Sequence, residues 1–334
     1  MLAELLFLSR QDLIGLGITI RDVIHVVEDA LRQQAAGQVL MPDKLALFWK
    51  QNGNLIAMPA YIGAQDALGI KWVGTVPANN DRDLPQTSAL VILNDPDTGF
   101  PLAVMDGTWI TAMRTGAVSA VAAQRLAPSR VETLGLVGCG VQMRTQLLAL
   151  TTVLSPKRVR VYDLRPSAMD AFVSQMSALV EAAIEPCSTP RDVVEDADVV
   201  VTATWLASPP KPIIKDEWLK PGVLALPIDS DSIWDPPAYL RADKFLTDRW
   251  EPLQHFAEVG FFPQGLPRLY AELHEVVGGA KPGRESDQER IVVMNGGMAI
   301  EDVTMAKLVY ERARAAGAGT RLPFITSAQE VFQF

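Results

Sequence analysis

The sequence predicts an α/β protein with two domains. Its 334 residues are enough to build two hydrophobic cores. Strand patterns fill residues 44–106, whereas residues 134–163 have the pattern of a buried strand, a glycine-rich turn, a helix and a second strand. The second pattern is typical of a doubly wound parallel sheet. We therefore expect an α+β domain in the N-terminal part and a parallel α/β domain after it.

The glycine-rich turn lies in residues 135–142, Gly-Leu-Val-Gly-Cys-Gly-Val-Gln. Gly138 and Gly140 leave bare backbone, so a pyrophosphate could approach the N-terminus of the following helix. A second predicted strand, 158–162, is followed by Asp163. In dinucleotide-binding folds an acidic residue about 20 residues after the turn binds the ribose hydroxyls. The segment therefore predicts a Rossmann domain that binds a nicotinamide dinucleotide.

Three residues qualify this prediction. Met143 stands where the motif has its third glycine, so a turn that binds no dinucleotide is the alternative. Asp163 favours NAD because a carboxylate there repels the 2′-phosphate of NADP. Arg165 could partly reverse this preference, which leaves NADP as a second choice.

Composition and charge argue against several classes of protein. A net charge of −9 gives no electrostatic basis for nucleic-acid binding. Cys139 and Cys187 are too few for a disulfide framework, and His25, His255 and His274 show no metal-ligand spacing. The opening residues lack the basic region of a signal peptide, and no apolar run is long enough to span a membrane. We expect a cytoplasmic protein without a metal.

Other elements follow from helix and strand signals. Ser9 and Thr19 are predicted to cap the first two helices, within residues 9–37. Further helices are expected at 108–126 and 300–316, and the last of these should pack on the N-terminal layer. Further strands of the parallel sheet are expected at 199–204, 222–226 and 244–247.

Charged residues beside apolar or tightly turned segments are candidates for substrate binding. Lys44, Lys71 and Arg114 supply positive charge in the first half. Hydride transfer needs orientation, complementary charge and one proton carrier. Asp229 and Asp231 follow a predicted strand, at the edge where ligands bind in open α/β sheets. The alternatives are a solvent-facing strand lysine, a surface ion pair for the arginine and a solvated acidic turn.

Two segments closely resemble a known family. Residues 105–117, Met-Asp-Gly-Thr-Trp-Ile-Thr-Ala-Met-Arg-Thr-Gly-Ala, precede an alanine-rich helix and the Gly-Cys-Gly-Val-Gln of residues 138–142. This order is similar to that of the ornithine cyclodeaminase/mu-crystallin family. Further matches extend over nearly the whole chain: Met41-Pro42, Met58-Pro59-Ala60, Gly69-Ile-Lys71, Asp95-Pro-Asp-Thr-Gly99, Val201-Thr-Ala-Thr204, Asp231 and Gly297-Met-Ala-Ile-Glu301-Asp302.

The resemblance implies a homodimer whose subunit has two domains. Residues 1–116 and 306–334 would form the domain for substrate binding and dimerisation. Residues 117–305 would form the Rossmann domain. In the family, the residues that match Lys71 and Arg114 hold the substrate carboxylate, and Lys44 is a third candidate ligand.

The remaining site residues follow from the same resemblance. The aspartate matching Asp231 contacts the substrate nitrogen and moves protons, with Lys71 as the second catalytic candidate. Ile56 and Thr87 are further candidates for substrate contact. The residues implied to hold the dinucleotide are Gly138, Gly140, Val141, Gln142, Asp163, Arg165, Thr202, Thr204, Arg114 and Asn295.

Departures from the family pattern concern the substrate. Lys44 stands where the family usually has an arginine, and a lysine supplies a point charge instead of a bidentate fork. Ile56 stands where ornithine enzymes have a glutamate that faces the distal amine. Burying that ammonium group against isoleucine would leave a charge unpaired, so ornithine should be a poor substrate. Ser232-Ile-Trp-Asp-Pro-Pro replaces a glycine-lysine-glutamate loop, and Asn295-Gly-Gly replaces a segment beside the nicotinamide.

These observations predict an NAD(P)-dependent oxidoreductase that acts on the Cα–N bond of an amino or imino acid. It would be an amino-acid dehydrogenase, a ketimine reductase or an opine-type dehydrogenase, with a small amino or keto acid as its substrate. A cyclodeaminase that recycles its NAD is the first alternative. A non-catalytic, crystallin-like protein that binds a small ligand is the second.

Overall fold

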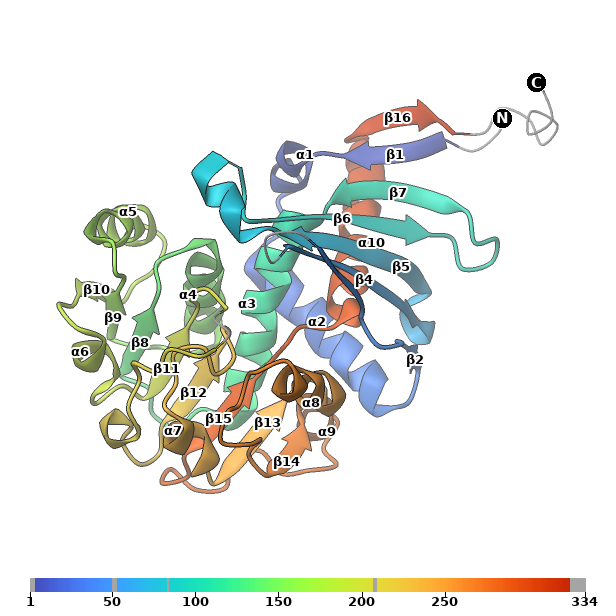
Figure 1. Ribbon diagram of the computed structural model, residues 1–334. Helices are drawn as coiled ribbons and strands as arrows, with labels where there is room; N and C mark the ends of the chain where they lie inside the picture. The colour runs from blue at the N-terminus through green and yellow to red at the C-terminus, as the bar shows by residue number, and fades with distance from the viewer. Residues whose placement is uncertain (1–3, 50–52, 83, 207–208, 325–334) are drawn as a thin grey trace. The chain divides into compact units, whose positions relative to one another are not determined.

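The chain forms two compact units, which the computed structural model describes for residues 4–49, 53–82, 84–206 and 209–324 (Figure 1). The first unit contains the described residues up to Arg114 and those from Met298 onward, and the second is Thr115–Gly297. We expected the joins after residue 116 and before residue 306. The structure places Thr115 and Gly116 in the second unit and residues 298–305 in the first, where Glu301 and Asp302 form ion pairs.

The first unit contains an eight-stranded sheet in the order β16-β1-β7-β6-β5-β4-β2, with β3 also paired to β4. Its neighbouring strands are antiparallel except for the parallel pair of β1 and β7. The strands are β1 (Glu4–Leu8), β2 (Val39–Leu40), β3 (Leu45–Trp49), β4 (Gly53–Ile62), β5 (Ala67–Thr75), β6 (Thr87–Asn94), β7 (Pro101–Asp106) and β16 (Thr320–Pro323).

Helices cover one face of this sheet. The helices are α1 (Arg10–Gly15), α2 (Ile20–Ala35) and α10 (Ala299–Ala316), with short 3-10 helices at Gly63–Gln65 and Pro77–Arg82. Helix α10 packs on β4, β5 and β6, and α2 packs on α10, as expected for the last helix. Ser9 and Thr19 cap α1 and α2 with reciprocal side-chain hydrogen bonds, which confirms both predicted caps.

The two faces of the sheet differ because side chains alternate along each strand. Lys71 pairs in register with Met58 on β4 and Val91 on β6, so these residues share the face covered by α10. Trp72 and its partner Leu90 lie on the opposite face and are exposed. The chain leaves this unit within α3 (Gly107–Leu126), which continues into the second unit.

The second unit is built on an eight-stranded parallel sheet in the order β10-β9-β8-β11-β12-β15-β13-β14. The strands are β8 (Thr133–Val137), β9 (Arg158–Tyr162), β10 (Ala183–Pro186), β11 (Val199–Thr202), β12 (Leu224–Pro227), β13 (Lys244–Thr247), β14 (Leu269–Glu272) and β15 (Ile291–Met294). The helices are α4 (Val141–Val153), α5 (Pro166–Met176), α6 (Pro190–Val194), α7 (Pro236–Leu240), α8 (Trp250–Glu258), α9 (Leu273–Val277) and a 3-10 helix at Asp216–Trp218.

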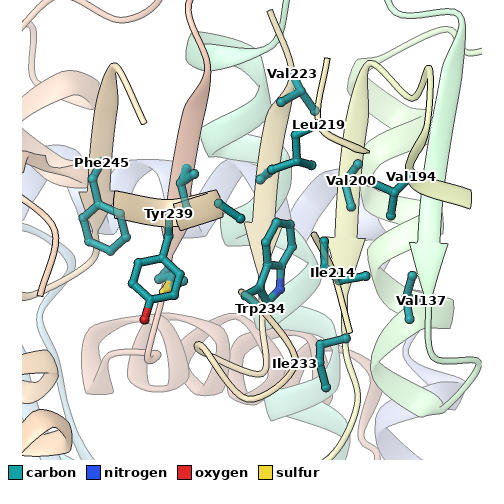
Figure 2. Packing of buried hydrophobic residues seen from close by; sticks show 14 of the residues in the cluster. Val137, Val194, Val200, Ile214, Leu219, Val223, Ile233, Trp234, Tyr239 and Phe245 are labelled. Atoms are coloured by element: carbon teal, nitrogen blue, oxygen red, sulfur yellow. The ribbon is translucent and has the colours of Figure 1, made fainter. Parts of the chain in front are cut away.

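Apolar side chains from the central strands and the following loops form the core of this unit (Figure 2). The strands are buried on both faces, which explains their uninterrupted Val, Leu and Ile runs. Trp234 and Tyr239 are the largest fully buried side chains there. Both come from the segment after β12, so the core of this unit holds the chain that follows Asp231 in place.

Candidate functional site

The glycine turn joins β8 to α4 in the second unit. Gly138 adopts a left-handed φ of 97°, and a Cβ atom there would lie 2.5 Å from the carbonyl oxygen of Ala203. Gly140 is different: it precedes α4 as its N-cap residue, and a Cβ atom would meet open space. Gly138 is therefore needed for the turn itself, while Gly140 leaves bare backbone at a helix N-terminus that suits a phosphate group.

Asp163 lies beside this turn because β9 ends next to β8. Its carboxylate accepts hydrogen bonds from the backbone N–H groups of Cys139 and Arg165, both at 2.9 Å. The guanidinium group of Arg165 is 3.6 Å from the same carboxylate and is itself exposed. Val141, at the first position of α4, is also exposed. The predicted acid, turn and helix therefore come together as a dinucleotide site requires.

Two buried amide oxygens near the ends of this site have no hydrogen-bond partner within the part of the chain that the structure describes. They are Oε1 of Gln142, in the first turn of α4, and Oδ1 of Asn295, directly after β15. Unpaired buried acceptors are rare in proteins and call for an explanation. Together with the bare backbone at Gly140, they fit a polar ligand that brings its own donors. A nicotinamide dinucleotide is such a ligand.

Thr202 and Thr204, both predicted to hold the dinucleotide, use their hydroxyl groups within the second unit. Both donate hydrogen bonds to the buried carboxylate of Asp229. Thr202 also accepts a 2.8 Å hydrogen bond from the indole N–H of Trp234. Burial raises the pKa of Asp229 and these hydroxyl groups oppose the rise. The two threonines thus hold the acidic turn after β12, and sequence reasoning missed this role.

Asp231 follows in the same turn and is the second unit's main candidate for acid–base chemistry. Its carboxylate is 1% exposed. Oδ2 accepts a 2.6 Å hydrogen bond from the backbone N–H of Phe262, while Oδ1 has no hydrogen-bond partner among the described residues. Burial raises the pKa of Asp231 to about 6, partly opposed by the Phe262 N–H. A carboxyl group with a pKa near the working pH and one unused oxygen is suited to proton transfer.

Two cations of the first unit, Lys71 and Arg114, are buried in an ion-pair cluster formed by β5, α3 and α10. Nζ of Lys71 is 2.6 Å from Oδ2 of Asp302. Arg114 binds the same carboxylate through Nε at 3.0 Å and Oε2 of Glu301 through Nη1 at 2.7 Å. All four side chains are buried. Lys71 is therefore no solvent-facing strand lysine, and Arg114 forms no surface ion pair.

Burial has a direct effect on Lys71. It lowers the pKa of this lysine to about 8, with the charge of Arg114 as the next cause and Asp302 opposing the change. Lys44, just before β3, also lowers the pKa of Lys71 because its positive charge repels the charged form of that lysine. From the sequence, Glu301 and Asp302 were identified only as matches to the family pattern, with no role of their own. Two adjacent acids in the otherwise uncharged opening turns of a predicted helix were the available signal for counter-ions.

Ile56 and Thr87, the further candidates for substrate contact, lie on the same face of the sheet as Lys71 according to the strand register. Ile56 pairs with Val73, two residues along β5 from Lys71, and therefore lies on the same face. Thr87 pairs with Thr75, and their hydroxyl oxygens are 3.2 Å apart. This part of the face presents an isoleucine and a pair of hydroxyl groups. A substrate with a cationic side chain would need a carboxylate here.

Two further expectations concern absences. Among the described residues, no group of three or more His, Cys, Asp or Glu side chains could hold a metal ion. Within the same ranges, no helix is both long and apolar enough to cross a membrane. Cys139 is buried, which raises the pKa of its thiol to about 12 and makes it unsuited to nucleophilic catalysis.

Comparison with known proteins identifies the family. The model of the ornithine cyclodeaminase/mu-crystallin family matches residues 6–317. The chain belongs to this family. Among its curated relatives is the alanine dehydrogenase of Archaeoglobus fulgidus, which is 36% identical over 328 residues that cover 96% of this chain and 99% of that protein.

Solved structures of family members have the same fold. The Δ1-pyrroline-2-carboxylate reductase of Thermococcus litoralis, in complex with NADH and L-proline, is 34% identical with a TM-score of 0.86, covering 95% of this chain and all of that one. An archaeal alanine dehydrogenase dimer with bound NAD is also 34% identical with a TM-score of 0.86, covering 97% of this chain and all of that one.

Proposed function

We propose that this member of the family is an NAD(P)-dependent oxidoreductase that acts on the Cα–N bond of an amino or imino acid. The observation that carries the proposal is Asp231: a buried carboxyl group with one unused oxygen and a pKa of about 6, after a central strand of a dinucleotide-binding sheet. The similarity to alanine dehydrogenase and pyrroline-2-carboxylate reductase over nearly the full chain supports the same reaction class.

The cofactor residues follow from the geometry of the second unit. Gly138 and Gly140 would receive the pyrophosphate, and Asp163 the adenosine ribose. Asn295 would accept a hydrogen bond from the carboxamide. A bound nicotinamide supplies or accepts the hydride. Because a carboxylate beside the ribose repels a 2′-phosphate, NAD is the preferred cofactor and NADP the second choice.

The substrate residues follow from the charges of the first unit. Lys71, Arg114 and Lys44 would hold the substrate carboxylate, with Asp302 keeping the first two in place. Asp231 would donate a proton to the substrate nitrogen in the reductive direction and accept one in the oxidative direction. Binding, orientation and one proton carrier are what hydride transfer asks of the protein.

The substrate side chain should be uncharged. Ile56 and the hydroxyl pair of Thr75 and Thr87 share the face of Lys71. A cationic side chain placed there would lose its hydration without gaining a counter-ion, which costs several kcal/mol. We therefore expect small neutral amino acids, or cyclic ketimines with a neutral ring, to be turned over in preference to ornithine.

The open face of the first unit's sheet supports a homodimer. Its exposed apolar side chains share register positions opposite to Lys71 and are between 41% and 73% exposed. They are Phe7, Leu45, Leu47, Trp49, Trp72 and Leu90. A contiguous apolar face of this kind marks an interaction surface. A second copy of the chain fits, because a similar alanine dehydrogenase is a dimer.

A substrate panel tests the proposal. Purified protein would be mixed with NADH and either pyruvate plus ammonium or cyclic ketimine carboxylates, and NADH oxidation followed by absorbance. We expect oxidation with at least one of these and at least a hundredfold loss of rate in Asp231→Asn. Ammonia release from ornithine without net NADH change would instead assign the cyclodeaminase reaction. Dinucleotide binding without any turnover would favour a non-catalytic binding protein.

A further inference from the structure

Several buried oxygens in the second unit have no hydrogen-bond partner among the described residues, and two of them share one neighbour. These two are Oδ1 of Asp231 and the hydroxyl oxygen of Tyr239. The shared neighbour is Phe262, whose N–H holds Oδ2 of Asp231 and whose ring meets the edge of the Tyr239 ring at 5.7 Å. Figure 2 shows the Tyr239 hydroxyl at the border of the apolar cluster, whereas the Trp234 indole lies within it.

Phe262 adopts a backbone conformation that a phenylalanine rarely adopts. Its φ is 53°, in the left-handed region, and it precedes Pro263, which further restricts the backbone. Its ring is buried, at 3% exposure. Strained residues persist only where their surroundings hold them, and they gather at functional sites. Here the strain places one N–H group 2.6 Å from a catalytic candidate.

The main chain on both sides of Asp231 is also fixed. The N–H of Ser232 donates to the carbonyl of Asp229, and the N–H of Trp234 donates to the carbonyl of Asp231. The Trp234 indole is tied to Thr202 on β11. With backbone and Oδ2 both held, the carboxylate of Asp231 has one oxygen left to take part in chemistry.

The charge of the Asp231 carboxylate acts on the phenol of Tyr239. The negative charge of Asp231 raises the pKa of Tyr239, after burial and before Asp235 among the causes. The phenol therefore stays protonated near neutral pH and has an O–H proton to donate. Besides burial, the groups that act on the pKa of Asp231 are the backbone N–H groups of Phe262 and of Asp231 itself, which lower it, and the like charge of Asp229, which raises it. A donor such as the phenol would complete the environment of the carboxylate.

We propose that Tyr239 is a positioning residue for Asp231, whose phenol hydrogen-bonds to Oδ1 through one water molecule and stabilises the carboxylate for proton transfer. A buried polar site with unpaired groups is where such a water is expected. The water would be displaced or shifted when a substrate nitrogen arrives, so that the same phenol then faces the reacting group. The inference rests on the proposed role of Asp231 in catalysis.

Tyr239→Phe tests this inference because it removes one oxygen and keeps the ring contact with Phe262. The readout is the pH dependence of kcat/KM for amine oxidation, which requires the deprotonated carboxylate and so rises through the pKa of Asp231. Losing a donor to the carboxylate should move this midpoint upward by about one pH unit and lower kcat/KM about fivefold at pH 6. Tyr270→Phe is the control, since that hydroxyl donates to the carbonyl of Pro282.

A second readout does not require turnover. The thermal stability of the wild-type protein should step between acid and neutral pH as Asp231 titrates, and this step should move upward by the same amount in Tyr239→Phe. If both the kinetic midpoint and the stability step stay where they are in Tyr270→Phe while Asp231→Asn is inactive, this inference is wrong and the proposed function stands. If Asp231→Asn is fully active, both are wrong.

Discussion

Asp302 is the side chain on which both proposed carboxylate ligands depend. It bridges Nζ of Lys71 and Nε of Arg114 while fully buried. It also lies in the first turn of α10, where the helix N-terminus favours negative charge. A buried ion pair adds little stability compared with an apolar pair, but removing one partner leaves an uncompensated charge. The Asp302 carboxylate therefore keeps both cations in place for an anion.

Asp302→Asn should weaken both the fold and the site. We expect the free energy of unfolding to fall by about 3–5 kcal/mol, measured by urea titration. The pKa of Lys71, already lowered to about 8, should fall further because its counter-ion is lost. Carboxylate binding requires charged Lys71, so the alkaline rise of KM should move from near pH 8 to at least one unit lower.

The matched control is Glu311→Gln. Glu311 lies on the same helix and pairs with Lys307 as an exposed ion pair. Such pairs contribute little to stability, so both measurements should stay at their wild-type values. An Asp302→Asn protein with wild-type stability and an unchanged KM profile would contradict the role given to the bridge.

Asp231→Asn should make the protein more stable near neutral pH while abolishing activity. Burial raises the pKa of Asp231 from 3.8 to about 6. The stabilising contribution of the protonated carboxyl is therefore present below pH 3.8 and is lost as the pH rises through 6. Asparagine cannot ionise, so urea unfolding at pH 8 should show a gain on the order of 3 kcal/mol. Near pH 4 the two proteins should unfold alike, and a variant less stable than wild type at pH 8 would contradict the assignment.

The chemistry of single residues was partly predictable from the sequence. Residue type and local turn pattern indicated Lys71, Arg114 and Asp231. Their partners were harder to predict because they come from distant segments: Asp302 meets Lys71 from the last helix, and Phe262 meets Asp231 from a loop after α8. A hydrogen bond from a backbone N–H leaves no signal in residue type, so the role of Phe262 could be found only in the structure.

At the scale of elements, the two glycines of the β8–α4 turn should respond differently to alanine. Gly138→Ala should destabilise the protein by several kcal/mol because its left-handed φ and the close carbonyl of Ala203 leave no room. Gly140→Ala should leave the melting temperature unchanged, because its Cβ atom meets open space. NADH affinity should nevertheless fall at least tenfold, measured by calorimetry. Unchanged affinity in Gly140→Ala would place the pyrophosphate elsewhere.

Local signals predicted most elements around the turn. The strand, glycine turn, helix and second strand appear as β8, α4 and β9, and the capping residues of α1 and α2 are correct. The strand expected over 199–204 stops at Thr202 because the N–H of Thr204 turns to Asp229. The central strand β15 and the strands β10 and β14 were not predicted. The last two lie at the edges of the sheet, and β10 carries the polar and proline residues that blunt such edges.

At the scale of the whole molecule, the open face of the first unit's sheet should hold two copies together. Leu47→Asp places a charge on the apolar face, where Leu47 is 58% exposed. We expect the variant to shift from dimer to monomer in light scattering coupled to size-exclusion chromatography. Leu179→Asp is the control, since Leu179 is 61% exposed in the second unit. A wild-type protein that is already monomeric would contradict the dimer.

The sequence predicted two units of different fold and the family to which the chain belongs. It did not predict where the chain returns to the first unit. The eight residues from Met298 to Met305 belong to that unit, where their helix packs and where two of them form ion pairs. Residue patterns report local structure well. Long-range electrostatic pairing is decided only once the chain has folded.

The central claim, hydride transfer at a Cα–N bond, is tested most directly by isotope transfer. NADH carrying deuterium at its transferable position would be incubated with the protein and the best keto acid plus ammonium, or cyclic ketimine, of the panel. We predict one deuterium at Cα of the amino-acid product for each NADH oxidised, and neither event in Asp231→Asn. Product formed without deuterium and without net NADH consumption would contradict the account.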